Sequence, residues 1–355
     1  MTDDNKAVPD VRNIKPLGSV RRRPIPHAAA DLVVIRDMLA GCPLPGLAEP
    51  SVPRIALAAW ISQCRDLVLA ELARRGALLF RGFRVEDASE LASVASACAT
   101  STLMSYSERS SPRRPVGSGV YTSTEYPASK AIFMHNENAY AHTWPRRLCF
   151  SCVRPAQQGG ATPIADTRRV LQRIDPAVVR GFEERGVLYV RRFGGPLGLH
   201  WRDVFQVDSI DALERAYAPF GYAIERGADE RVVTRRRGQA VIAHPESGER
   251  SWFNHAAFFH RSGLGENLDG IIAEKDLPAD TFYGDGEAIA PEIVAAIKDA
   301  YHQETVRFTW QAGDVLLVDN LITAHGRDAF VGERAVHVAM VDPMSCADAF
   351  SNGGQ

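Results

Sequence analysis

The sequence predicts a mainly β fold with flanking helices, an α+β protein whose strands form a barrel or sandwich. Two observations lead to this prediction. Short strand-like runs separated by turn residues recur from about residue 119 onward, as in GVYTST, AIFMHNE and DVLLVDN. Helical patterns interrupt these runs only locally, so the regular strand–helix alternation of a doubly wound parallel sheet is absent.

The elements before residue 100 follow a simple order. Residues 1–50 are rich in Arg and Pro and show little periodicity, so we expect an extended arm over the surface. Apolar residues recur at helical spacing over residues 55–75, and Gly76 is placed to end this predicted helix. Residues 77–83 predict a short buried strand, and residues 85–99 predict a second amphipathic helix.

The rest of the chain predicts one large domain. The 355 residues, 45% of them hydrophobic, are enough for one large domain or two modest ones. No internal repeat divides the strand-rich part. We therefore expect residues 51–355 to form a single domain, with an insertion at about 190–300 between two halves of the β core.

Composition excludes several classes of partner. A formal net charge of -2 gives no reason to expect nucleic acid or an anionic membrane surface. No run of 18 apolar residues is present, so we expect no membrane span, and the charged N-terminus lacks the apolar core of a signal peptide. The six scattered cysteines suit free thiols in a reducing cytoplasm.

One pair of cysteines has the spacing of a redox or zinc motif. Cys149 and Cys152 lie in LCFSCV, an apolar run typical of a strand, without the Gly or Pro turn of a redox loop. Residues three apart on a strand point to opposite faces, so the two thiols should not converge. We therefore expect both cysteines to pack in the core.

A histidine and a glutamate two positions apart indicate a candidate metal site. If FMHNE is a strand, His135 and Glu137 point to one face and direct an imidazole and a carboxylate at one point. A third ligand could be His325, which follows the apolar run DVLLVDN and should lie at a strand end. Two histidines and one carboxylate are typical of non-haem Fe(II) oxygenases. The spacing alone is weak, because a histidine bonded within a core or turn is the ordinary alternative.

Longer segments carry a more specific signal. The chain resembles the TauD/TfdA-like Fe(II)/2-oxoglutarate-dependent dioxygenases, and most closely the branch with clavaminate synthase and the amino-acid β-hydroxylases of antibiotic pathways. The resemblance implies a double-stranded β-helix, or jelly-roll, core. The matching segments keep the family's order and are GALLFRGF (76–83), YTSTEYP (121–127), HNENAYAHTWP (135–145), RPAQQGGATPIADTRRV (154–170), GLHWRDVFQ (198–206), SWFNHAAFFH (251–260), YGDGEAI (283–289) and WQAGDVLLVDNLITAHGRDAFVGER (310–334).

The resemblance implies roles for five residues. His135, Glu137 and His325 match the iron-binding triad, and the implied cofactors are Fe(II), 2-oxoglutarate as co-substrate, and O2. Thr162 matches the threonine that contacts 2-oxoglutarate. Arg334 matches the arginine that binds the distal carboxylate of 2-oxoglutarate, for which a planar guanidinium with two parallel donors is well suited. Without the motif, Arg334 would be read as a solvated arginine at a strand edge.

Two positions narrow the chemistry that the resemblance implies. Related halogenases replace the acidic ligand by a small residue, and Glu137 fills that position here, so hydroxylation is favoured over halogenation. Some relatives bind the acid group of their substrate with a second arginine four residues after the first. That position is Val338 in this chain, so a small sulfonate or carboxylate held in that manner is disfavoured.

Candidate substrate contacts follow the ligand segment and lie in the insertion. Asn138 and Tyr140 could line the pocket, and Asn254 and His255 could face the substrate, although aromatic segments of this kind are more often core. Arg191 and Arg192 could meet an acidic substrate or the phosphopantetheine arm of a carrier protein. The alternative for these two arginines is a solvated strand.

The expected function is therefore hydroxylation of an unactivated C–H bond in an amino acid or an amino-acid-derived group. The substrate would be a small molecule, free or tethered to a carrier protein, and the pathway one of secondary metabolism such as antibiotic biosynthesis. Two alternatives remain open at this point: a zinc hydrolase with the same three ligands, and a catalytically silent binding module. Nothing in the sequence indicates the oligomeric state.

Overall fold

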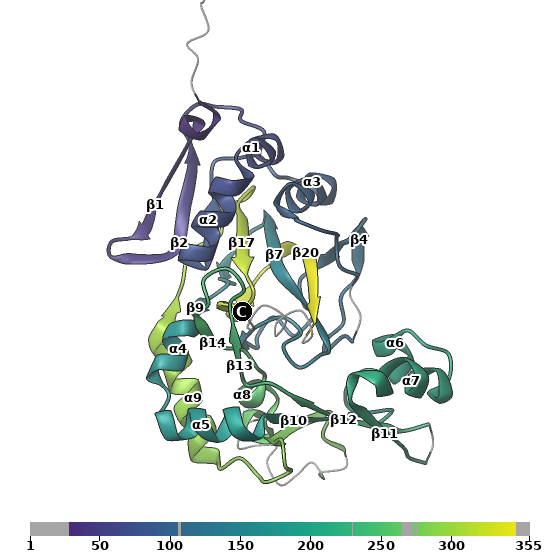
Figure 1. The fold of residues 1–355 in the computed structure, drawn as a ribbon. Helices are drawn as coiled ribbons and strands as arrows, with labels where there is room; N and C mark the ends of the chain where they lie inside the picture. The colour runs from purple at the N-terminus through teal and green to yellow at the C-terminus, as the bar shows by residue number, and fades with distance from the viewer. Residues whose placement is uncertain (1–27, 106–107, 229, 265–272, 274–275, 346–355) are drawn as a thin grey trace, which may run out of the picture.

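The computed structural model describes residues 28–105, 108–228, 230–264, 273 and 276–345. Two β-sheets pack on each other, helices cover their outer sides, and a third sheet extends to one side (Figure 1). Within this part of the chain, no helix has both the length and the apolar character needed to cross a bilayer.

The larger sheet has eight strands in the order β1-β2-β3-β17-β7-β20-β5-β4. Its neighbours are antiparallel except β2 and β3, which are parallel. Side chains alternate across it: Leu79 and Leu316 face the smaller sheet, whereas Leu78 and Leu317 face the covering helices. The strands are β1 (Val33–Leu39), β2 (Cys42–Pro50), β3 (Ala77–Phe80), β4 (Pro115–Gly117), β5 (Val120–Thr122), β7 (Thr143–Arg154), β17 (Val315–Asp319) and β20 (Ala335–Ser345).

Residues 33–50 differ from the extended arm expected over residues 1–50. They form the β1–β2 hairpin at the edge of the larger sheet, and Leu44 and Leu47 are buried in the cluster between the two sheets. Prolines and a glycine in β2 suggested a loop, but pairing with β3 and burial of apolar side chains decide the conformation. Residues 1–27 of the expected arm lie outside the described residues.

The smaller sheet has the order β16-β9-β18-β6, all antiparallel. Apolar side chains of both sheets share one buried cluster, in which Ile164 of the smaller sheet packs with Phe150 and Val338 of the larger one. Two sheets packed in this way confirm the predicted jelly-roll core with flanking helices. The strands of the smaller sheet are β6 (Ile132–His135), β9 (Ile164–Asp166), β16 (Thr305–Val306) and β18 (Thr323–Arg327).

Three helices cover the outer face of the larger sheet. They are α1 (Leu57–Gln63), α2 (Arg65–Arg75) and α3 (Ala88–Cys98). The single helix predicted over residues 55–75 is thus two helices that meet at Cys64. Gly76 ends α2 with a φ of 86°, a conformation that glycine adopts at low cost. The carboxylate of Asp87 caps α3 by accepting from the Glu90 amide at 2.8 Å.

The segment between the two halves of the core builds the third sheet, in the order β11-β12-β10-β15. Helices α6 and α7 pack against one side of it (Figure 1). Helices α4, α5, α8 and α9 surround a separate cluster that includes Phe182 and Trp252. The elements are α4 (Thr167–Arg173), α5 (Pro176–Arg185), β10 (Val187–Phe193), α6 (Trp201–Phe205), α7 (Ile210–Tyr217), β11 (Tyr222–Arg226), β12 (Val232–Gly238), β13 (Val241–Ala243), β14 (Arg250–Trp252), α8 (Ala256–Phe259), β15 (Ala279–Tyr283) and α9 (Pro291–Glu304).

Short elements complete the described chain. The 3-10 helices are η1 (Ala29–Leu32), η2 (Ala218–Phe220) and η3 (Arg261–Leu264), and β8 (Gln158–Gly159) pairs with β19 (Phe330–Val331).

The CxxC cysteines are core residues, as predicted. Both lie on β7 and are fully buried, but Cys149 packs under the covering helices while Cys152 faces the smaller sheet. Burial raises the pKa of the Cys152 thiol to about 12. A hydrogen bond with Cys98, together with burial, raises the pKa of the Cys149 thiol. Thiols that stay protonated and point to opposite faces do not form a redox pair.

Candidate active site

Two neighbouring strands bring together the three candidate metal ligands. His325 on β18 lies directly opposite His135 on β6, and their ring centroids are 4.4 Å apart. Glu137 follows in the turn after β6. One ligand atom from each of the three side chains lies within 4.8 Å of the others. The three residues could therefore hold one metal ion, with the two-histidine, one-carboxylate donor set that suits Fe(II).

The strands that carry the three ligands differ from the predicted ones in two respects. His325 does not follow a strand end but lies within β18, a strand that the sequence pattern did not reveal. β6 ends at His135, so Glu137 reaches the site from a turn and not from the same strand face. Pairing of β18 with both β6 and β9, rather than strand periodicity, places His325.

Hydrogen bonds hold the ligands in place. The Nδ1–H of His135 donates to the Phe133 carbonyl at 2.9 Å, which leaves Nε2 with its lone pair for a metal. Asn320 fixes the turn of Glu137: its Oδ1 accepts from the Glu137 amide at 2.7 Å, and its Nδ2 donates to the Glu137 carbonyl at 3.0 Å. Asn320 is fully buried and was not identified from the sequence, where it was only the last residue of an apolar strand run.

A buried arginine pairs with the carboxylate of the site. Nη2 of Arg113 donates to Oε2 of Glu137 at 2.6 Å, and both side chains are 3% exposed. The same Oε2 lies 3.8 Å from Nε2 of His325. Arg113 was not predicted as a site residue, since one arginine in a proline-flanked segment carries no local signal. The pair orients Glu137 and balances its charge in a dry environment.

Burial keeps the site histidines in their neutral form. Burial lowers the pKa of His135, and burial together with the charge of His135 lowers the pKa of His325 far more. Only a neutral imidazole offers a lone pair to a metal. The site is therefore ready to bind a cation at neutral pH without first releasing protons.

A smaller cavity is lined by the two histidines and by Arg113, Arg327 and Arg334. Arg334 donates from Nε to the Gly160 carbonyl at 2.9 Å and from Nη2 to Oγ1 of Thr162 at 3.3 Å, and Trp310 also donates to this Oγ1 at 3.0 Å. Arg327 donates to the carbonyls of four residues. The residues that line the cavity are Arg113, Ser123, Thr124, Ile132, His135, Phe150, Thr162, His325, Gly326, Arg327, Arg334 and Val336.

The charge of this cavity suits an anionic ligand. Among the described residues, no carboxylate pairs with Arg334 or Arg327. Burial and the neighbouring charge of Arg327 lower the pKa of Arg334 to about 10. A partly buried guanidinium without a counter-ion is unfavourable, and a bound carboxylate would remove that cost. The residues present therefore fit a dicarboxylate co-substrate placed between the metal ligands and Arg334.

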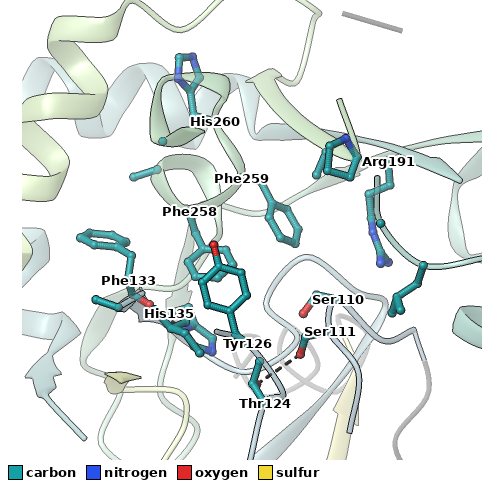
Figure 2. A pocket seen from close by; sticks show the side chains of 18 of the residues that line it. Ser110, Ser111, Thr124, Tyr126, Phe133, His135, Arg191, Phe258, Phe259 and His260 are labelled. Carbon is teal, nitrogen blue, oxygen red and sulfur yellow. Dashed lines mark hydrogen bonds between the residues drawn. The ribbon is translucent and has the colours of Figure 1, made fainter. Parts of the chain in front are cut away.

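A larger cavity of about 520 Å³ opens on the other side of His135. Figure 2 shows His135 and Phe258 at one end and Arg191 and His260 farther along the wall. Apolar rings cover much of the wall near the metal ligands. The two cavities share Arg113, Thr124, Ile132 and His135, so a ligand in either one lies against the metal site.

The four predicted substrate contacts are not part of this cavity wall. Tyr140 donates to the Glu108 carbonyl at 2.5 Å, and Asn138 is buried beside it with a φ of 57°. Asn254 is bonded to the backbone at the start of α8, where its Oδ1 accepts from the Ala256 amide at 2.8 Å. His255 lies 5.8 Å from the ring of His135, and its Nε2 bonds to the Asn136 carbonyl at 2.8 Å. These residues support the wall from behind.

Comparisons with known proteins agree with this geometry. Residues 42–340 match the family described as "Taurine catabolism dioxygenase TauD, TfdA family". The chain is 36% identical over 315 residues to the dapdiamide synthesis protein DdaC of Enterobacter agglomerans, covering 87% of this chain and 94% of that protein. It is 30% identical over 313 residues to the clavaminate synthase-like protein At3g21360 of Arabidopsis thaliana, covering 85% and 91%.

Solved structures share the fold at low sequence identity. PvcB, described as an Fe, alpha-ketoglutarate dependent oxygenase from an isonitrile synthetic pathway, has a TM-score of 0.53 at 17% identity, covering 91% of this chain and 98% of that one. AAD-2 in complex with Mn(II) and N-oxalylglycine has a TM-score of 0.51 at 13% identity, covering 87% and 96%. With the family match over most of its length and relatives at 30% identity or more, this chain belongs to the TauD, TfdA family of dioxygenases.

Proposed function

We propose that this protein hydroxylates an unactivated C–H bond of an amino acid or an amino-acid-derived group, free or tethered to a carrier protein. It is a 2-oxoglutarate-dependent dioxygenase that uses Fe(II), 2-oxoglutarate and O2. The ligands of the iron ion are His135, Glu137 and His325. Thr162 and Arg334 are the contacts for the distal carboxylate of 2-oxoglutarate.

One observation carries this proposal: the three ligand atoms lie within 4.8 Å of one another, and the two histidines share a cavity with the partly buried Arg334, which has no carboxylate partner among the described residues. A zinc hydrolase needs neither Arg334 nor Thr162, and a silent binding module needs no intact triad. The dioxygenase family match argues against both alternatives.

The residues of the chain have distinct tasks in this reaction. Fe(II), once held by His135, Glu137 and His325, would supply the oxidising chemistry, in which O2 gives one oxygen atom to the hydroxylated substrate and one to the succinate that forms from 2-oxoglutarate with loss of CO2. Arg113 orients Glu137, and Asn320 holds the turn that carries it. Phe258 and Phe259 on the wall of the larger cavity exclude water and orient the substrate. Because Glu137 keeps the acidic ligand in place, hydroxylation is favoured over halogenation.

Secondary metabolism, including antibiotic biosynthesis, is the proposed setting. The 36% sequence identity to a dapdiamide synthesis protein supports this assignment. The free cysteines of the described chain, such as Cys42 and Cys64, suit a reducing compartment such as the cytoplasm.

An anaerobic spectrum tests the proposal. Fe(II) and 2-oxoglutarate should give a weak visible charge-transfer band with the full-length protein, and His135→Ala and His325→Ala should abolish it. His200→Ala, a histidine at the start of α6 that lines neither cavity, should keep the band. Adding O2 with free amino acids or with aminoacyl groups on carrier proteins should then yield succinate. Absence of the band and of succinate would overturn the proposal.

A further inference from the structure

The wall of the larger cavity is positively charged. Its lining includes Arg113, Arg191, Arg192 and Lys298, and none of the described lining residues is aspartate or glutamate. A cavity that gathers cations without acidic side chains favours an anionic ligand. Arg113, Arg191 and Lys298 differ, however, in what they already bind.

Two of the arginines are engaged in holding the protein together. Arg113 pairs with Glu137. Arg191 donates from Nη2 to the Arg109 carbonyl at 2.6 Å and from Nη1 to the Glu108 carbonyl at 3.4 Å. The Arg191 guanidinium also lies over the ring of Tyr140, 4.8 Å from its centroid. These contacts attach the segment that carries Arg113 to the third sheet.

Lys298 is in a different position. It lies on α9 at the cavity wall, and no carboxylate of the described chain forms an ion pair with it. Its Nζ lies 5.8 Å from the ring centroid of Phe133, which is two residues before the metal ligand His135. Burial lowers the pKa of this ammonium group. A partly desolvated cation without a counter-ion gains most from an anion delivered by a ligand.

The sequence gives a second reason to look for a new acid-binding residue. Some relatives bind the acid group of their substrate with an arginine at the position of Val338. In this structure Val338 is fully buried between the two sheets, on the interior of β20. An acidic substrate must therefore be recognised from another element.

We propose that Lys298 binds an acid group of the substrate, a carboxylate or a phosphate, and thereby sets which carbon lies at the metal site. This inference rests on the proposed function and adds a substrate class to it. The acid would lie against α9, and the apolar part of the substrate would extend past Phe133 and Phe258 toward His135. A free amino acid would supply a carboxylate, and a carrier-tethered substrate would supply the phosphodiester of its arm.

Matched pairs of probes, with and without an acid group, test this inference. The protein, loaded with Mn(II) and 2-oxoglutarate, is titrated calorimetrically with L-leucine against L-leucinamide, and with pantetheine 4′-phosphate against pantetheine. At least one probe with an acid group should bind at least about tenfold more tightly than its counterpart without that group, as expected of a hydrogen bond to a charged group. The pair that shows the preference identifies the source of the acid group.

Variants then assign the preference to one residue. Lys298→Met should abolish it, Lys298→Arg should keep part of it, and Lys130→Met, which removes an exposed lysine outside both cavities, should leave it unchanged. Circular dichroism and thermal unfolding show whether each variant is folded. Equal affinities for both members of every pair, or a preference that survives in folded Lys298→Met, would overturn the inference.

The charge-transfer band keeps this result separate from the proposed function. If the anaerobic band forms but no acid preference is found, only the role of Lys298 fails. If the band does not form, the proposed function itself fails.

Discussion

The two cavities that meet at His135 differ in the origin of their walls. The smaller one is built by the jelly-roll core, with His325 on β18, Thr162 before β9 and Arg334 before β20. The larger one takes much of its wall from the insertion, through β10, α8 and α9. We propose that this difference separates two tasks, with the core binding the metal and the co-substrate and the insertion selecting the substrate. Changes in one wall should therefore leave ligands of the other nearly unaffected.

Arg334 offers the sharpest test of this separation. In Arg334→Met the dissociation constant of 2-oxoglutarate should rise at least about 100-fold, because the variant loses a charge-assisted pair between the guanidinium and the distal carboxylate. Titration of the charge-transfer band measures this constant. The affinity of an acidic probe for the larger cavity should change by less than about threefold.

Two further variants serve as controls for Arg334→Met. Arg334→Lys should restore part of the affinity but not all, since an ammonium lacks two parallel donors. Arg180→Met, which removes an exposed arginine on α5, should behave as the unmodified protein. Unchanged binding of 2-oxoglutarate in Arg334→Met would place the co-substrate elsewhere.

Substitution of Arg113 should affect ligands of both cavities, because this residue lines both of them. Arg113→Met should weaken Fe(II) binding about 10- to 100-fold, the range for residues that orient a metal ligand. Competition with a fluorescent chelator under anaerobic conditions measures this loss. The adjacent Arg114, which is exposed and pairs with Glu125, is the matched control, and Arg114→Met should bind the metal normally. Equal metal affinity in both variants would show that Glu137 needs no partner.

The smallest effect concerns pH. Burial lowers the pKa of His135, His255 and His325 below the unfolded value, so the unfolded chain binds more protons as the pH falls below about 6.5. The free energy of unfolding of the protein is therefore highest near pH 7, where these histidines are neutral in both states. It falls toward pH 5, because protonation then stabilises the unfolded chain. Each histidine contributes a slope of up to about 1.4 kcal/mol per pH unit.

Unfolding of the metal-free protein by urea between pH 5 and pH 7 measures this slope. His255→Gln should reduce it by the share of one histidine, and His200→Gln controls for the substitution itself. A slope that His255→Gln leaves unchanged would mean that His255 is not held neutral by its surroundings.

The sequence predicted the parts of the fold that are locally encoded. Short apolar runs marked β7 and β17, and Gly76 marked the end of a helix. The sandwich itself followed from many short strands with turns between them. The five residues assigned through the family resemblance all lie around the smaller cavity or on the metal site beside it.

The missed features depend on contacts between distant segments. β18 contains histidine, glycine and arginine and lacks an apolar alternation, so only its pairing with β6 and β9 reveals a strand. The β1–β2 hairpin carries prolines that indicate a loop when read alone. Arg113 and Lys298 face the site only because the loop before β4 and helix α9 fold against the core. Side chains that reach a site only through tertiary packing leave no periodic pattern in the sequence.

The direct opposition of His135 and His325 in the β6–β18 pair has a consequence for folding. Successive residues of a strand alternate between faces, so a slip of one residue in this pairing would turn His325 away from His135 and leave no metal site. A metal ion can therefore bind tightly only after these distant segments have found their correct alignment. A bound ion therefore stabilises only the correct strand register, because chains with a shifted register cannot bind it.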